Sequence, residues 1–243
     1  MSNPSTRDTL LSVIVPAHNE ADNLKVLLPR LFQSLFGMHR DFEILIVDNA
    51  STDQTPEVLS EFQKTIPQLR VVREPVLGYG RAVLSGLKGA RGAVLGIIRA
   101  DNQEKSEDLC RIAIALEESG FAMYKAVRKN RKSDGLKRVI ISFFFNTLFT
   151  WGFGLHSRDL NATPKVVTRA FYHAAHLRST DWFIDAEMVI KAEKMGYPIG
   201  EMEIEYLPRL KGSSNVRLRH IFEFLGNMLQ WRLRLYHGKL LEE

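Results

Sequence analysis

The chain has 243 residues, 45% of them hydrophobic and 25% charged, a composition typical of one large globular domain with a sizeable core. This composition excludes an intrinsically disordered chain, and the single cysteine, Cys110, excludes an internal disulfide framework. The net charge of +5 favours an anionic partner, a class that includes a nucleotide diphosphate, a lipid phosphate, an acidic bilayer surface and a nucleic acid.

The first half alternates strand-like and helix-like patterns, which predicts an α/β fold with a mainly parallel sheet and crossover helices. The expected strands are residues 10–16, 42–47, 69–73, 93–98 and 121–127. The expected helices are residues 20–36, a segment capped by Ser51 or Thr52 that runs to about Lys64, and residues 78–90 and 106–119. The alternation stops near residue 130, so we expect a differently built second half within one domain, residues 1–243.

The N-terminal nine residues are polar and lack the apolar core of a signal peptide. The longest apolar candidate, Val139 to Leu155, is broken by Ser142, Asn146 and Thr147, so no stretch reaches the roughly 18 apolar residues of a membrane span. We therefore expect a cytoplasmic protein that touches a membrane without crossing it.

Polar turns follow three of the expected strands: Val-Pro-Ala-His-Asn-Glu at 15–20, Val-Asp-Asn-Ala-Ser-Thr-Asp at 47–53 and Arg-Ala-Asp-Asn-Gln at 99–103. Ligands bind outside the carboxyl ends of strands in open α/β sheets, so we expect the three turns to form one site. Within the third turn, the oxygen donors of Asp101 and Gln103 suit Mg²⁺ or Mn²⁺. Taken singly, Asp-Asn-Gln is also typical of a plain turn, and Asn19 and Glu20 are also typical of a helix cap.

The order and wording of these turns resemble family 2 glycosyltransferases of the GT-A fold, particularly the polyprenyl (dolichyl) phosphate sugar synthases. The resemblance implies a metal-dependent, inverting transfer of a sugar from a nucleotide diphosphate donor to polyprenyl phosphate. It assigns the metal to Asp101 and Gln103, and residues 1–130 to nucleotide-sugar binding. The donor-binding residues that it implies are Pro16, Ala17, Asn19, Glu20, Asp48, Gly78, Arg81, Arg99, Ala100, Asp101 and Lys211.

Two residues depart from the family's wording. Arg99 stands where an aspartate is common, and the resemblance leaves it in position to contact a phosphate directly. Asn49 replaces a frequent second aspartate after Asp48. In Gly78-Tyr79-Gly80-Arg81, which resembles the family's Gly-x-Gly stretch, small residues are expected to let the backbone approach the nucleotide. The chain lacks a complete Gly-x-Gly-x-x-Gly after its first strand, which argues against a dinucleotide dehydrogenase.

The second half, residues 131–243, is expected to form the acceptor side. Phe-Ile-Asp-Ala-Glu at 183–187 is similar to a frequent acceptor-side motif, with Asp185 as the base or acceptor-orienting carboxylate. Its alternative is an ordinary acidic first turn of a helix. Residues 209–214 resemble the Arg-x-x-Gly-x-Ser loop of the lipid-phosphate branch, so Arg209 is expected to act in catalysis and Lys211 to bind phosphate. The alternative for residues 209–214 is an ordinary solvated basic loop. A looser resemblance to the family implies that Asp159 lies near the sugar.

Two segments, 140–153 and 216–236, combine aromatic with basic residues, which suits amphipathic helices at an anionic membrane interface. A buried core helix is the alternative for the first segment, and a homodimer interface is the alternative for the second. Two other functions stay open: transfer to a saccharide acceptor, for which Asp185 would be an obligatory base, and a catalytically weakened nucleotide-binding scaffold marked by Arg99 and Asn49. The chain contains no RNA-recognition motif, so we expect no nucleic-acid partner.

Overall fold

The computed structural model describes residues 10–129, 153–208 and 226, and all structural statements below concern these residues. The strands are β1 (Leu11–Ala17), β2 (Phe42–Asn49), β3 (Leu69–Glu74), β4 (Val94–Ile97), β5 (Met123–Arg128), β6 (Lys165–Thr168) and β7 (Ile199–Ile204). The helices are α1 (Ala21–Phe36), α2 (Thr55–Thr65), α3 (Tyr79–Gly89), α4 (Ser106–Ser119), α6 (Arg169–Ala175) and α7 (Ile184–Lys194). Among them, none is long and apolar enough to cross a membrane. Arg209, Lys211 and the expected amphipathic residues 140–152, 216–225 and 227–236 lie outside the described residues. Phe153, the last residue of the first amphipathic segment, is buried in the core, so its expected place at a membrane surface was wrong.

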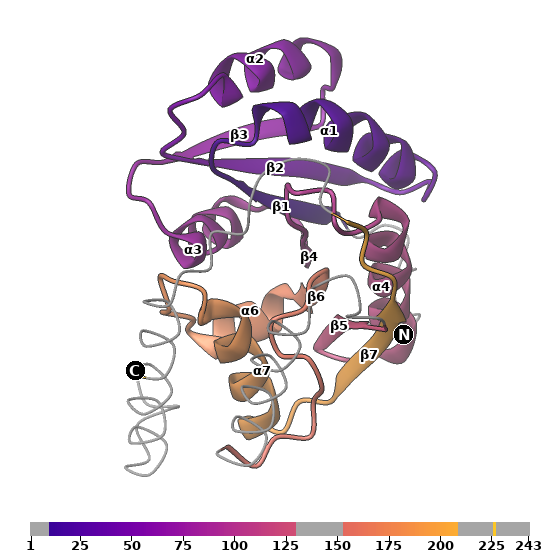
Figure 1. The fold of residues 1–243 in the computed structure, drawn as a ribbon. Coiled ribbons are helices and arrows are strands. Elements are labelled where there is room, and N and C mark those ends of the chain that lie inside the picture. The colour runs from indigo at the N-terminus through magenta and orange to yellow at the C-terminus, as the bar shows by residue number, and fades with distance from the viewer. Residues whose placement is uncertain (1–9, 130–152, 209–225, 227–243) are drawn as a thin grey trace.

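The strands form one seven-stranded sheet in the order β3-β2-β1-β4-β6-β5-β7 (Figure 1). β1 pairs in parallel with β2 and β4, and β2 pairs in parallel with β3. β6 runs antiparallel to both β4 and β5, whereas β5 and β7 are parallel to each other. The expected mainly parallel α/β sheet is thus confirmed, and strands from both halves of the chain share it.

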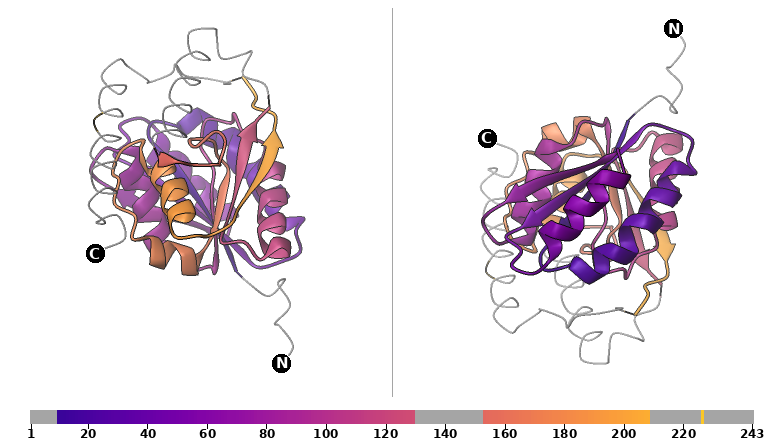
Figure 2. Two further views of the ribbon diagram at one scale, coloured as in Figure 1. Left: turned by 90° about the horizontal axis from the view of Figure 1, so that it is seen from below. Right: turned by 90° about the horizontal axis from the view of Figure 1, so that it is seen from above.

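Two apolar layers cover the two faces of the sheet. On one face, α1, α2 and α4 pack through a buried stripe on α1 that recurs at helical spacing. The members of that stripe are Leu24, Leu27, Leu28, Leu31 and Leu35. On the other face, α3, α6 and α7 pack against a second buried cluster. The views from below and above show the sheet between these helices (Figure 2).

The start of α2 differs from the sequence prediction. Ser51 and Thr52 were expected to cap this helix, but it begins at Thr55 after Gln54. Both residues instead belong to the preceding turn, where the Ser51 hydroxyl accepts a hydrogen bond from the backbone N–H of Asn19. The expected cap was wrong because these side chains bond to a neighbouring loop rather than to the helix that follows them.

Candidate functional site

The carboxyl ends of β1, β2 and β4 lie at one edge of the sheet, as the sequence predicted. In the register of the sheet, Ala17 lies beside Asp48, and Ile14 lies beside Ile97. The parallel pairing therefore places Pro16 and Ala17 next to the end of β2, with the turn at residues 99–103 following β4 on the other side. Three polar turns from separate parts of the sequence are brought together at this edge (Figure 1).

Asn19 ties the first two turns to each other. Its backbone has a φ of 57°, and its side-chain oxygen accepts hydrogen bonds from the backbone N–H groups of Thr52 at 2.8 Å and Asp53 at 3.2 Å. Asparagine tolerates this left-handed conformation better than most residues. Glu20 precedes α1 without capping it through its side chain, and its own N–H donates to the Thr55 hydroxyl at 3.0 Å.

Asp53 links the amino ends of two helices. Its carboxylate accepts hydrogen bonds from the backbone N–H groups of Ala21 in α1 at 3.3 Å and of Thr55 in α2 at 3.0 Å. Partial burial opposes ionisation, but these hydrogen bonds outweigh it and lower the pKa of Asp53 below its ordinary value. The residue therefore holds the two turns in place.

Asp48 and Asn49 end β2 and are both buried. The Asp48 carboxylate accepts a hydrogen bond from the Ser51 N–H at 3.2 Å. The Asn49 amide nitrogen donates to the backbone carbonyls of Glu74 at 3.2 Å and Val76 at 2.7 Å, while its oxygen accepts from the N–H of Gly78 at 2.8 Å. A carboxylate could not make the two donor contacts, which gives a physical reason for an asparagine at position 49.

The third turn carries Ala100, Asp101, Asn102 and Gln103, all buried at the sheet edge. The Asp101 carboxylate accepts a hydrogen bond from the Gln103 N–H at 3.3 Å. The Gln103 side-chain nitrogen donates a hydrogen bond to the Leu207 carbonyl at 3.3 Å, and this contact fixes the orientation of the side-chain amide. Asn102 has a φ of 56° and donates to the carbonyl of Asn23, which ties the turn to α1.

The donor set of this turn suits a metal ion that shares its coordination with a ligand. The described residues include no group of three or more His, Cys, Asp and Glu side chains placed to hold a metal on their own. Mg²⁺ is commonly held by one or two protein carboxylates, with substrate phosphates and water as its other ligands. Asp101 and Gln103 fit that second arrangement, in which a diphosphate completes the coordination.

The Arg99 side chain donates hydrogen bonds to other side chains of the protein. Its Nε donates to Glu104 at 2.9 Å, its Nη2 donates to the Tyr206 hydroxyl, and its guanidinium lies 5.5 Å from the centre of the Tyr206 ring. Burial opposes the charge, but the nearby acidic groups outweigh it and raise the pKa of Arg99 above its ordinary value. The side chain retains 20% exposure, and the direct phosphate contact stays a prediction.

The glycines at the start of α3 allow the backbone of another segment to approach closely. A Cβ built on Gly78 would lie 2.7 Å from the Thr180 carbonyl oxygen, and one built on Gly80 would lie 2.4 Å from that of Ser179. Arg81 also donates its N–H to the Thr180 carbonyl at 3.2 Å, while its side chain is exposed. The glycines therefore let segment 179–182 pack against α3, a contact that the sequence did not indicate; approach of a nucleotide to them stays a prediction.

Segment 179–182 brings an aromatic pair to the site. The Tyr79 and Trp182 rings stack at 4.5 Å with an interplanar angle of 11°, and Trp182 is 44% exposed. Burial, together with the charge of Asp185, raises the pKa of Tyr79 well above its ordinary value. The stacked pair therefore connects the amino end of α3 to the segment that precedes α7.

Asp185 lies in the first turn of α7, as predicted, and is buried. Its partner is Lys165 on β6, whose ammonium lies 2.7 Å from the Asp185 carboxylate and donates to the Ala162 carbonyl at 2.7 Å. Burial lowers the pKa of Lys165, although Asp185 opposes this effect. Lys165 is fully buried, so its ammonium is held in one place and fixes the orientation of the Asp185 carboxylate. This role was not predicted from the sequence.

Asp159 and Lys125 lie at the neighbouring strand. Arg128 of β5 makes two hydrogen bonds to the Asp159 carboxylate, at 2.8 Å and 2.6 Å, so this carboxylate is used within the protein. Lys125 is registered beside Lys165 in the sheet and contacts Glu201 at 3.2 Å. Burial lowers the pKa of Lys125 to about 8. An isolated lysine in a strand pattern gives no sequence signal of such a buried network.

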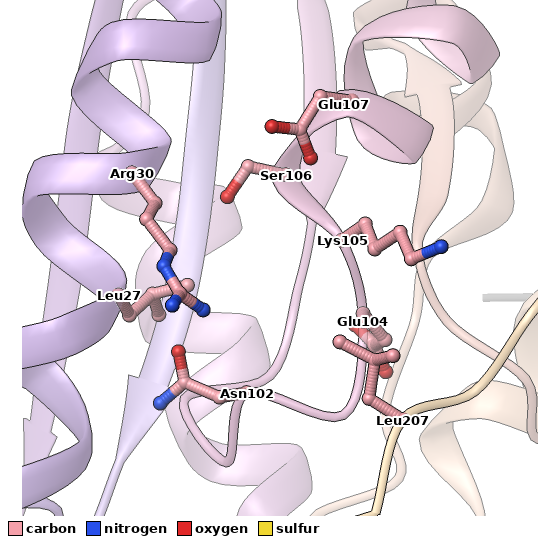
Figure 3. Close-up of a pocket in the computed structure, with 8 residues that line it drawn as sticks. All are labelled: Leu27, Arg30, Asn102, Glu104, Lys105, Ser106, Glu107 and Leu207. Carbon is pink, nitrogen blue, oxygen red and sulfur yellow. The ribbon is translucent and has the colours of Figure 1, made fainter.

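A small pocket lies on the α1 and α4 side of the third turn (Figure 3). Its lining includes Arg30 of α1, Asn102 and Glu104 of the turn, and Leu207. Its volume of about 150 Å³ is below the roughly 300–1,000 Å³ typical of small-molecule sites. We therefore do not place a nucleotide sugar in this pocket.

Residues 12–181 match the family model described as glycosyl transferase family 2. An undecaprenyl-phosphate 4-deoxy-4-formamido-L-arabinose transferase of Edwardsiella ictaluri is 27% identical over 226 residues, which cover 90% of this chain and 66% of that protein. A protein of the same description from Pseudomonas fluorescens is 31% identical over 130 residues, which cover 53% of this chain and 38% of that protein. The chain thus spans less than two thirds of the length of these relatives.

Solved structures share the fold. Mannosyl-3-phosphoglycerate synthase from Rubrobacter xylanophilus aligns with a TM-score of 0.74 and 19% identity, covering 97% of this chain and 76% of that chain. Glucosyl-3-phosphoglycerate synthase from Mycobacterium tuberculosis, crystallised with Mn²⁺, UDP-glucose and phosphoglyceric acid, aligns with a TM-score of 0.69 and 16% identity, covering 92% of this chain and 80% of that chain. At these identities the likeness concerns the fold alone, and it confirms the expected GT-A type.

Proposed function

Because the chain belongs to glycosyl transferase family 2, we propose that it transfers a sugar from a nucleotide diphosphate donor bound at the edge formed by β1, β2 and β4. The observation that carries this proposal is the meeting of three polar turns at the carboxyl ends of these parallel strands. This is the place where open α/β sheets bind their ligands. The family match covers all three turns.

Each turn has a proposed task in donor binding. Glu20 and Asp48 bind the nucleoside with Pro16, Ala17 and Asn19 of the first turn. Asp101 and Gln103 hold Mg²⁺ or Mn²⁺, an assignment supported by the oxygen donors of the turn and by the Mn²⁺ in the solved structure of similar fold. Such an ion neutralises the charge that develops on the departing diphosphate.

Other proposed donor contacts surround these turns. Gly78 and Arg81 at the amino end of α3, and Ala100 before Asp101, complete the described part of the donor site. Arg209 and Lys211, which lie outside the described residues, are proposed to bind phosphate because their loop resembles that of the lipid-phosphate branch. Basic side chains there would stabilise the leaving group.

The proposed acceptor is polyprenyl phosphate, attacked with inversion at the sugar carbon. Two relatives are described as undecaprenyl-phosphate sugar transferases, which supports this acceptor class. A lipid phosphate arrives ionised near neutral pH and needs no base. Asp185, oriented by Lys165 at 2.7 Å, then positions the acceptor rather than removing a proton.

A lipid acceptor also implies a meeting place with the bilayer. We propose peripheral association with the cytoplasmic face of a membrane, carried by the basic and aromatic residues of segments 140–152 and 216–236. The alternative for segment 216–236 is the contact in a homodimer.

Product analysis tests the proposed function. The full chain would be incubated with a panel of nucleotide diphosphate sugars, Mn²⁺ and undecaprenyl phosphate, and the products would be identified by mass spectrometry. We expect a glycosyl lipid phosphate, with appreciable turnover kept in Asp185→Asn and full turnover in the surface control Glu61→Gln. A product with the sugar on a saccharide hydroxyl would overturn the proposed acceptor. A lipid-phosphate product combined with a loss of about 10² to 10⁴ in the Asp185→Asn rate would contradict the positioning role proposed for Asp185.

A further inference from the structure

The Glu104 carboxylate is fully buried directly after the third turn and is surrounded by donors. Its Oε1 accepts hydrogen bonds from the Arg99 Nε at 2.9 Å, the Tyr206 hydroxyl at 2.6 Å and the Thr163 hydroxyl. Its Oε2 accepts from the Arg99 backbone N–H at 3.1 Å. A buried carboxylate needs such compensation, and Arg99 supplies both the charge and two of the hydrogen bonds.

Tyr206 joins this cluster from the segment after β7. Its hydroxyl accepts from Arg99 and lies 2.9 Å from the Thr163 carbonyl as well as near Glu104. The centre of its ring lies 5.5 Å from the guanidinium of Arg99 and 5.3 Å from that of Arg128. A cation over an aromatic ring is attracted to the face of the ring, so both arginines help to hold Tyr206 in place. We call Arg99, Glu104 and Tyr206 the polar joint.

The residue next to Tyr206 contacts a proposed metal ligand. The Leu207 N–H donates to the Gln103 carbonyl at 2.8 Å, and the Gln103 side-chain nitrogen donates back to the Leu207 carbonyl at 3.3 Å. The second hydrogen bond fixes the orientation of the Gln103 side-chain amide. The orientation of Gln103 therefore depends on where Leu207 is held.

We propose that the polar joint is a positioning device that locks residues 205–207 onto the third turn and thereby aims Gln103 at the metal. Arg99 is then a positioning residue that acts through Glu104 and Tyr206, and not a phosphate ligand. The inference rests on the proposed function, because Gln103 needs an orientation only if the turn binds a metal with the donor. It also accounts for the departure at position 99, where an aspartate would put a second carboxylate beside the buried Glu104.

Two conservative substitutions test the polar joint. Tyr206→Phe keeps the ring beside the two guanidinium groups but removes the hydroxyl, and Arg99→Lys keeps the charge but cannot reach Glu104 and Tyr206 together. Tyr124→Phe on β5 is the matched control, since the hydroxyl of Tyr124 has no role in the joint. Two quantities would be measured in each variant: hydrogen exchange of the Leu207 amide, and Mn²⁺ affinity in the presence of UDP and, separately, of GDP.

The expected result is at least a tenfold faster exchange at Leu207 and at least a tenfold weaker Mn²⁺ affinity in both joint variants, with neither change in Tyr124→Phe. The double variant should be no worse than either single variant, because residues that act as one unit are not additive. A phosphate-binding Arg99 predicts the opposite pattern: Mn²⁺ affinity unchanged in Tyr206→Phe and reduced in variants of Arg99 alone. That pattern, or unchanged Leu207 exchange in Tyr206→Phe, would overturn the inference. If exchange at Leu207 becomes faster in the joint variants but the wild type does not bind Mn²⁺ in the presence of either nucleotide, the result would instead contradict the proposed function.

Discussion

At the scale of single residues, Asn49 shows how one amide holds the site together. Asn49→Asp would replace a two-hydrogen donor with a carboxylate that faces the carbonyls of Glu74 and Val76. We expect this variant to lose about 2 to 3 kcal/mol of unfolding free energy, because two donor contacts become repulsive in a buried place. Urea unfolding of the two proteins measures the difference.

Asn19→Asp is the matched control for that experiment. Asn19 uses its side-chain oxygen to accept from the N–H groups of Thr52 and Asp53, and an aspartate keeps these acceptor contacts. Its unfolding free energy should change by less than about 1 kcal/mol. Equal losses in Asn19→Asp and Asn49→Asp would show that the donor contacts of Asn49 do not decide its identity.

The lowered pKa of Lys125 predicts that the free energy of unfolding depends on pH. Its pKa is lowered by burial from 10.5 to about 8 in the folded chain, so between these two pH values the unfolded chain binds more protons than the folded chain. Stability contributed by this residue therefore rises with pH across that window. Relative to Lys125→Met, the wild type should gain up to roughly 3 kcal/mol of unfolding free energy between pH 8 and pH 10.5, because each pKa unit corresponds to about 1.4 kcal/mol. Urea unfolding at both pH values checks this, and a difference that does not change with pH would contradict it.

At the scale of elements, the amino end of α3 depends on close backbone contact. In Gly80→Ala, the new Cβ would lie 2.4 Å from the Ser179 oxygen and 2.6 Å from the Asp181 oxygen, so α3 or segment 179–182 must move. We expect a loss of about 1 to 3 kcal/mol of unfolding free energy, as for other overpacked sites, and a weakened Tyr79–Trp182 stack. Thermal unfolding and the fluorescence of Trp182 report the two effects.

Gly37→Ala provides the comparison for Gly80→Ala. Gly37 ends α1 with a helical φ of −65°, and its Cβ would meet atoms no closer than 3.5 Å. This substitution should be neutral or slightly stabilising, because alanine restricts the unfolded chain. If both variants unfold at the wild-type temperature, the contact between α3 and segment 179–182 carries no energetic weight.

The elements that the sequence predicted well are those with strong periodicity. The apolar stripe of α1 and the alternation of strands and helices through α4 identified the parallel half of the sheet. The start of α2 was missed because Ser51 and Thr52 bond to the Asn19 loop, a contact between residues far apart in sequence. The antiparallel insertion of β6 between β4 and β5 was not predicted either, because strand order is set by tertiary pairing.

At the scale of the whole molecule, the sequence predicted where the three polar turns meet better than it predicted the contacts that hold the surrounding side chains. Residues at strand ends, such as Asp48 and Asp101, are visible because polar residues follow apolar runs. Lys165 and Tyr206 were missed because a buried lysine and a segment folding back from β7 gain their roles only from the assembled fold. Those two residues orient Asp185 and the third turn, so the supporting contacts are what the structure adds.

The central claim is that this sheet edge binds a nucleotide diphosphate sugar through a metal at Asp101 and Gln103. The most direct test is calorimetry of a panel of nucleotide diphosphate sugars with Mn²⁺, with EDTA, and with the variants Asp101→Ala and Asp41→Ala. Asp41 is an exposed aspartate immediately before β2, at the opposite end of that strand from Asp48, and serves as the matched control. We predict that EDTA and Asp101→Ala each weaken binding at least tenfold, about 1.4 kcal/mol, while Asp41→Ala leaves it unchanged. Binding that is unchanged both in EDTA and in Asp101→Ala would contradict the account.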